Sequence, residues 1–240
     1  MKTIRVLVLV TVLISMLGWT VGLEAKKKDK AEQVQLLLDD TKLEQADYYD
    51  GLKVVALKSF VDAVQLPKTE DMKTIKSEMD IANINSQWSE ECASVALGYR
   101  QEFVKSVAEG KAKASGNTGG SDNLDISDSV KQDIAKLKSG ETKMSEMQQT
   151  FFLSSLVHLA SAVYIEKTVL EGAKMFVETA KGAKGPAAMK YAKDLPVASK
   201  IVADLPGTLA TQLATLKDFM AIATTQNIEV PKDVTSKMNF

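Results

Sequence analysis

Residues 151–165 read FFLSSLVHLASAVYI, and this stretch decides the fold. A helix with this sequence is apolar on nearly every face, and such a helix is normally surrounded by other helices rather than placed on a surface. We therefore expect it at the centre of an all-α bundle. It lies within a long helix predicted over residues 141–182, which Gly182, Gly185 and Pro186 bring to an end.

Two more long helices are predicted before this one. Residues 29–64 contain no proline and a single glycine, and their apolar residues recur at helical spacing. Pro67 ends the first helix, and a second follows over residues 70–112. Because only a short turn joins them, residues 29–112 should form an antiparallel αα-hairpin. Helices of this length extend about 50 Å, so the antiparallel helical bundle should be elongated.

Shorter elements are predicted in the rest of the chain. Residues 115–126 are rich in Gly, Ser, Asn and Asp, which predicts a loop. A short amphipathic helix should follow this loop and stop at Gly140. The motif Asp-Leu-Pro occurs at residues 194–196 and again at residues 204–206, which indicates a short helix between two proline-initiated starts.

The C-terminal helices should therefore be shorter than the three long ones. The last helix is predicted over residues 208–225, and residues 226–240 should form an extended tail because they contain Pro231. No stretch alternates between apolar and polar residues as a half-buried strand would. We predict one helical bundle domain over residues 26–225, followed by this C-terminal tail.

Residues 1–25 have the features of a secretory signal peptide. Lys2 and Arg5 precede a mostly apolar run from Val6 to Trp19, which is the order of a basic n-region and a short h-region. The protein is therefore predicted to be exported and to be periplasmic or extracellular. In the alternative, residues 4–21 remain as an N-terminal membrane anchor, although a helix of about 27 Å is marginal for a bilayer core.

The composition excludes several classes of function. Thirty basic and thirty-one acidic side chains give a net charge of −1, so the chain lacks the positive charge that nucleic-acid binding requires. One cysteine and one histidine exclude a disulfide framework and a zinc site built from these residues. The acidic residues 121–128 lack the EF-hand spacing. We predict no metal and no cofactor.

Two side chains with reactive chemistry occur once each. His158 could act as a general base beside neighbouring serines, but no nucleophile-elbow sequence is present, which favours a neutral core imidazole. Cys92 lies on an apolar helical face, which favours burial over an intermolecular disulfide, and the adjacent Glu90 and Glu91 should raise its thiol pKa. No catalytic residue is predicted, and the chain is not expected to be an enzyme.

The sequence favours a contact function over two alternatives. The preferred hypothesis is an exported, non-enzymatic helical-bundle protein that acts by protein–protein contact or self-association, as an accessory or scaffold component of a cell-envelope or secreted assembly. One alternative is a membrane-active protein that inserts residues 151–165; otherwise only the signal segment would contact a membrane. The other is a carrier of a hydrophobic small molecule or lipid. Its inter-helix cavity would be lined by Trp88, Tyr99, Phe151, Phe152 and His158.

Overall fold

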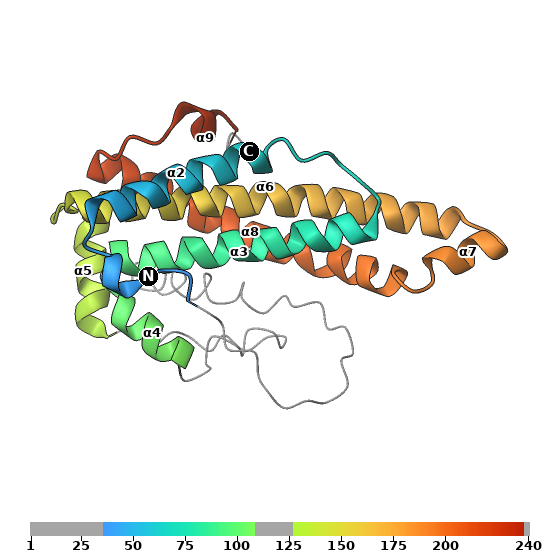
Figure 1. Cartoon of the computed structure of the whole chain (residues 1–240), viewed down its shortest axis with the longest axis horizontal. Coiled ribbons are helices and arrows are strands. Elements are labelled where there is room, and N and C mark those ends of the chain that lie inside the picture. The colour runs from blue at the N-terminus through green and yellow to red at the C-terminus, as the bar shows by residue number, and fades with distance from the viewer. Residues whose placement is uncertain (1–35, 109–126, 238–240) are drawn as a thin grey trace.

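The computed structural model describes residues 36–108 and 127–237. Every regular element in these ranges is a helix, which confirms the all-α prediction. Figure 1 shows long helices lying side by side in an elongated bundle. The predicted signal peptide and the predicted loop over residues 115–126 lie outside the described residues. The four long helices are α2 (Ala46–Ala63), α3 (Met72–Ala96), α6 (Glu146–Gly182) and α8 (Leu195–Gln226).

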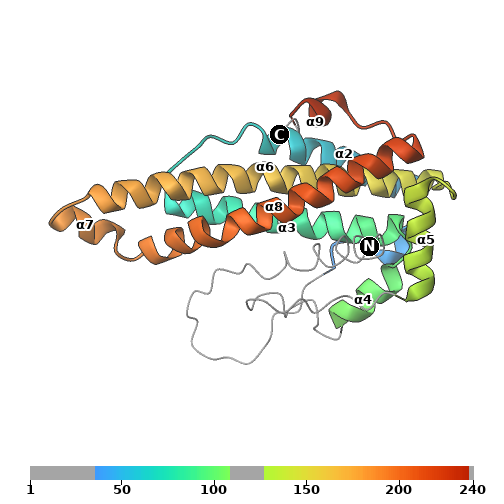
Figure 2. The ribbon, with the colours of Figure 1, turned by 180° about the vertical axis from the view of Figure 1, so that it is seen from behind.

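Helix α6 is the centre of the bundle. Helices α2, α3 and α8 each pack against it, and Figures 1 and 2 show the three arranged around it. Every residue from Phe151 to Val163 is buried, and Ile165 is buried as well. The prediction that this stretch forms the core is therefore confirmed, and its burial removes a large apolar area from water.

The start of α6 is set by a cap rather than by its apolar residues. Ser145 Oγ accepts the backbone N–H of Gln148 at 3.3 Å, and Gln148 Oε1 accepts the backbone N–H of Ser145 at 3.0 Å. This reciprocal capping box begins the helix at Glu146 instead of at residue 141. The short amphipathic helix predicted before it is α5 (Asp128–Ser139).

The second predicted helix, residues 70–112, is wrong in its extent. Helix α3 ends at Ala96, and α4 (Arg100–Ala108) begins after a break. Gly98 between them has a φ of 82°, in the left-handed region that glycine adopts readily. The backbone N–H of Tyr99 then donates to a carbonyl in the last turn of α3, which closes the helix end. Helix α4 therefore leaves the direction of α3 (Figure 1).

The first predicted helix is also too long, because the chain before α2 is held in another way. Residues 36–45 form no α-helix and contain only the 3-10 turn η2 (Asp40–Lys42). The carboxylate of Glu91 on α3 accepts the backbone N–H groups of Leu37 at 2.8 Å and Leu38 at 2.9 Å. These backbone donors therefore bind a side chain of α3, a helix that comes later in the chain, and are not available for helical hydrogen bonds. The segment crosses α3 and forms no α-helix.

Helix α8 corrects the prediction of two separate C-terminal helices. Pro196 lies in its first turn, and Pro206 lies in its interior without ending it. A proline inside a helix removes one backbone donor and bends the helix. Leu205 and Leu209 are nevertheless buried in the core on either side of Pro206. We infer that their burial outweighs the local cost, so the predicted helix start at residue 208 is wrong.

The C-terminal residues fold onto the bundle instead of forming only an extended tail. Helix α9 (Lys232–Lys237) follows Pro231, and its Val234 is fully buried. Val234 belongs to the same hydrophobic cluster as Phe151 and Phe152 of α6. A further short helix, α7 (Pro186–Tyr191), connects α6 to α8 at the far end of the bundle (Figure 2).

Candidate functional site

A polar contact joins three of the long helices in the bundle interior. Ser59 of α2 donates to Asn85 Oδ1 at 2.6 Å, and His158 Nδ1 of α6 lies 2.8 Å from the same oxygen. The Asn85 amide nitrogen donates to the carbonyl of Ile81 at 3.0 Å, so Oδ1 is the acceptor of both other bonds. The imidazole therefore carries its proton on Nδ1, and Asn85 links α2, α3 and α6.

The environment of His158 keeps its imidazole neutral. Its ring stacks on Trp88 with the centroids 5.7 Å apart and the planes 12° from parallel. Burial lowers the pKa of His158 to about 4, since the charged form loses its hydration. Nε2 has no hydrogen-bond partner among the described residues. The expected neutral core imidazole is therefore present, bonded to an asparagine rather than to a serine.

Two of the serines near His158 make hydrogen bonds within and between the helices. Ser155 Oγ donates to the carbonyl of Ser89 at 2.7 Å, and Ser161 Oγ donates to the carbonyl of Val157 at 2.9 Å. Each hydroxyl proton is thus used on a backbone carbonyl, as buried hydroxyl groups require. The Ser155 bond links α6 to α3, whereas the Ser161 bond lies within α6.

Two buried carboxyl groups retain protons near neutral pH. Burial, reinforced by the negative charge of Glu91, raises the pKa of Glu90 to about 8. Burial also raises the pKa of Glu166 to about 7, although the bond from Gln212 Nε2 at 2.7 Å opposes this increase. The protonation of these carboxyl groups therefore couples to folding.

The single cysteine is buried, as predicted. Burial and the negative charge of Glu91 raise the pKa of the Cys92 thiol to about 12. A thiol with this pKa carries almost no nucleophilic thiolate at neutral pH.

Four of the five residues predicted to line a cavity contact one another or other rings, and the fifth, Tyr99, is buried in the core. Trp88 covers His158, whereas Phe151 packs against Tyr49 at 6.1 Å and Phe152 against Phe219 at 5.1 Å between ring centroids. Tyr99, Phe151 and Phe152 belong to one hydrophobic cluster, and Trp88 packs against it. The ligand cavity itself stays a prediction.

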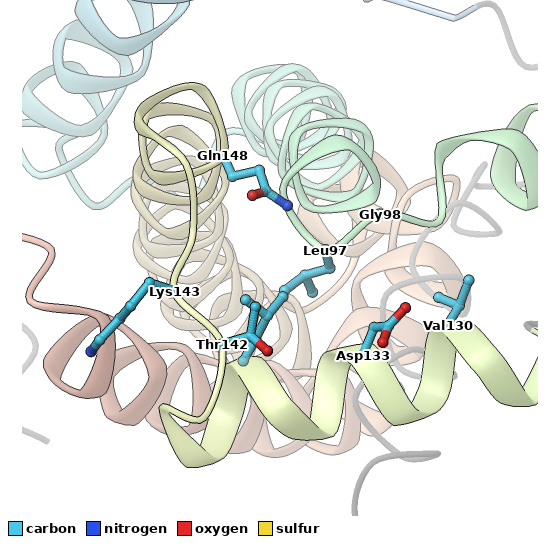
Figure 3. Close-up of a pocket in the computed structure, with 8 residues that line it drawn as sticks. Leu97, Gly98, Val130, Asp133, Thr142, Lys143 and Gln148 are labelled. Carbon is cyan, nitrogen blue, oxygen red and sulfur yellow. The ribbon is translucent and has the colours of Figure 1, made fainter.

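A pocket of about 190 Å³ lies elsewhere, at the end of the bundle near α5. It is smaller than the roughly 300–1,000 Å³ typical of small-molecule sites. Figure 3 shows Asp133 and Gln148 at its rim, whereas the end of the Lys143 side chain points away. The Lys143 ammonium group donates to the carbonyl of Thr225 at 2.7 Å. The pocket is lined by Leu97, Gly98, Val130, Asp133, Leu137, Thr142, Lys143 and Gln148.

The most conspicuous surface feature is an apolar area on α2 and α3. In the described ranges, seven large apolar side chains are exposed, and five of them belong to these two helices. One hydrogen bond, from Ser59 to Asn85, links the two helices, and each of them packs mainly against α6. Isolated exposed apolar residues are ordinary, but five of them on two helices that flank α6 are a candidate interaction surface. This α2–α3 face comprises Val54, Val55, Val61, Ile81 and Ile84.

Sequence reasoning missed Asn85 and the buried polar residues around it, although a signal was present. The apolar stripe of α3 runs through Met79 and Ala82 and then changes phase before Trp88. The structure shows that polar side chains occupy the interior positions at this point. These buried residues are Asn85, Ser86, Ser89, Glu90, Glu91 and Ser94.

Comparison with known proteins identifies no relative. No family model, no curated protein and no solved structure matches this chain. Within residues 36–108 and 127–237, no group of three or more His, Cys, Asp or Glu side chains is arranged to hold a metal ion. In the same ranges, no helix has the length and hydropathy of a membrane span.

Proposed function

We propose that this protein is an exported helical bundle that acts by contact with another protein, through the α2–α3 face. The role proposed is that of an accessory or scaffold component in a cell-envelope or secreted assembly. The observation that carries the proposal is the concentration of exposed apolar side chains on α2 and α3. The features of residues 1–25 support the export part of the proposal.

The physical basis of such contact is the exposed apolar area itself. Val54 is 65% exposed and Ile84 is 49% exposed, so both have area that a partner could remove from water. Each square ångström of apolar area buried contributes about 25 cal/mol. Charged side chains such as Lys58 and Asp80 are exposed on the same helices, which matches the polar rim that surrounds the apolar centre of protein interfaces.

The carrier and membrane-active alternatives have less support. The carrier proposal requires space among aromatic residues that pack against one another, such as Phe152 and Phe219. The membrane-active proposal requires residues 151–165 to leave the position where α2, α3 and α8 surround them. Exposing this stretch would cost the apolar burial that stabilises the bundle.

Site-specific photocrosslinking tests the contact function. A benzophenone amino acid placed at Val54 or Ile84 should give a crosslinked adduct with a single protein species, identified by mass spectrometry in cells that make the chain. The matched control is the same substitution at Lys217, which is exposed on α8. The proposal fails if positions 54 and 84 give no adduct, or only the adducts that position 217 also gives.

Cell fractionation tests the export part separately. The exported fraction should contain a shortened chain whose N-terminal residue, determined by sequencing, lies close to residue 26. A full-length chain in the membrane fraction would instead support the alternative of an N-terminal anchor. A chain found only inside the cell would contradict both.

A further inference from the structure

Helix α2 carries two separate apolar stripes. The first is the stripe that α2 buries in the core, and its members recur at helical spacing: Leu52, Ala56, Phe60 and Ala63. The second runs along another side of the helix and consists of Val54, Leu57 and Val61, followed by Val64 at the C-cap. Because the buried stripe already attaches α2 to the core, the exposed members of the second stripe, Val54 and Val61, are available for another contact.

The second stripe has the pattern of a helix-pairing seam. Its members follow one another at intervals of three, four and three residues, which is the a/d spacing of two helices that pack side by side. Val54 is 65% exposed and Val61 is 43% exposed, whereas Leu57 and Val64 are partly buried against the core. One edge of the seam, formed by Leu57 and Val64, therefore packs against the core, and the other edge, formed by Val54 and Val61, is exposed to solvent.

Two lysines border the middle of this seam. Lys53 and Lys58 occupy the positions that flank an a/d seam and face the flanks of the opposing helix. Neither forms an ion pair with any residue in the described ranges. Asp47 and Asp50 continue the line of the seam toward the start of the helix, beyond its apolar part, and Asp62 projects farther from the seam than the lysines do. Positive charge therefore lies on the two flanks of the apolar part, and the acidic residues lie beyond its N-terminal end.

We infer that the second stripe of α2 binds an amphipathic helix of a partner protein whose own apolar seam is flanked by Asp or Glu. This inference rests on the proposed contact function and specifies the partner's chemistry. A second copy of the chain fits less well, because it would present the same Lys53 and Lys58 and place like charges along both flanks. Opposite charges on the partner would instead select the correct helix.

Binding of two synthetic helical peptides to the purified protein tests this inference. Both peptides carry the same leucine and isoleucine seam, but one has Glu and the other Lys at the flanking positions. Fluorescence anisotropy should show at least tenfold tighter binding of the Glu peptide, which corresponds to about 1.4 kcal/mol. In the double variant Lys53→Glu, Lys58→Glu, the preference should reverse.

The control variant is Lys200→Glu, Lys217→Glu, which makes the same charge change at exposed positions of α8 and should keep the original preference. Circular dichroism and thermal unfolding check that all variants remain folded. Equal affinity for both peptides, no binding of either, or an unchanged preference in the Lys53/Lys58 variant would overturn the inference. So would a stable dimer that Val54→Asp dissociates. Crosslinking at Val54 without a peptide preference would leave the contact function intact and remove only this inference.

Discussion

Helices α6 and α2 differ in how far they bury their side chains. Between Phe151 and Val163, α6 buries every residue, including Ser154 and His158, whereas α2 leaves Val54 exposed to solvent. Three helices pack around α6, but α2 lies on the outside of the bundle. The position of a helix in the assembly therefore decides burial more strongly than the polarity of an individual residue. Polar groups at the centre need internal partners, and apolar groups at the edge become a surface for contact.

The largest expected difference between the two helices concerns the truncation of apolar side chains. Phe152→Ala in α6 should lower the free energy of unfolding by about 3–5 kcal/mol, because it leaves a cavity in a fully buried site. Val54→Ala in α2 should change it by less than about 0.5 kcal/mol. Chemical denaturation measures both values. Similar losses for the two variants would show that Val54 is covered in the folded protein.

The next largest effect is a dependence of stability on pH. Glu90 has a folded-state pKa of about 8, well above its ordinary value, so the folded state binds more protons than the unfolded state above about pH 4.5. The free energy of unfolding should therefore fall as pH rises towards 8. Between pH 6 and pH 9 the loss due to Glu90 should be about 3 kcal/mol.

The variant Glu90→Gln should remove this component, and denaturation curves at several pH values measure it. Asp80→Asn is the matched control, because Asp80 is an exposed carboxylate on the same helix and its replacement should leave the pH profile of the parent unchanged. A profile that is identical in the parent and in Glu90→Gln would contradict the proposed protonation of this carboxyl group.

A smaller effect is expected from adding a methyl group to a glycine on each helix. A Cβ at Gly172 of α6 would clash with the carbonyl oxygen of Thr69, whereas a Cβ at Gly51 of α2 would meet no atom within 4 Å. Gly172→Ala should therefore destabilise the protein by about 1–3 kcal/mol. Gly51→Ala should stabilise it by about 0.5–1 kcal/mol through better helix propensity. Thermal unfolding should show shifts of opposite sign, and shifts of equal sign would contradict this close approach.

The smallest effect on stability should come with a large effect on binding. The double variant Val54→Gln, Val61→Gln replaces two exposed residues of α2, so its free energy of unfolding should stay within about 1 kcal/mol of the parent. Binding of the Glu-flanked peptide should weaken at least tenfold, as measured by anisotropy. Unchanged binding would place the contact surface elsewhere on the molecule.

Local sequence patterns were sufficient for the centre of the fold and insufficient for its boundaries. Residues 151–165 predicted their own burial because no face of that helix is polar enough to meet water. Gly98 is visible in the sequence, but the apolar pattern continues past it, so the break between α3 and α4 was not predicted. The helix boundary predicted at Pro206 was wrong in the opposite sense, because α8 continues across a residue that usually ends a helix.

The candidate site was predictable only in part, because its partners are distant in the chain. His158 was expected to be a buried neutral imidazole, and it is. Its bond to Asn85 joins residues that are separated by 73 positions, and no local pattern identifies such a pair. The second apolar stripe of α2 could have been found from spacing alone, since Val54, Leu57, Val61 and Val64 are all visible in the sequence. The prediction for this helix considered only the apolar residues of its buried face.

The central place of α6 has a consequence for how the chain reaches its folded form. Two of the helices that surround α6 precede it along the chain, but α8 follows it and ends only at Gln226. During synthesis, the side of residues 151–165 that α8 covers therefore stays uncovered until nearly the whole polypeptide has been made. Burial of that side of α6 therefore depends on α8, the last of the four long helices along the chain.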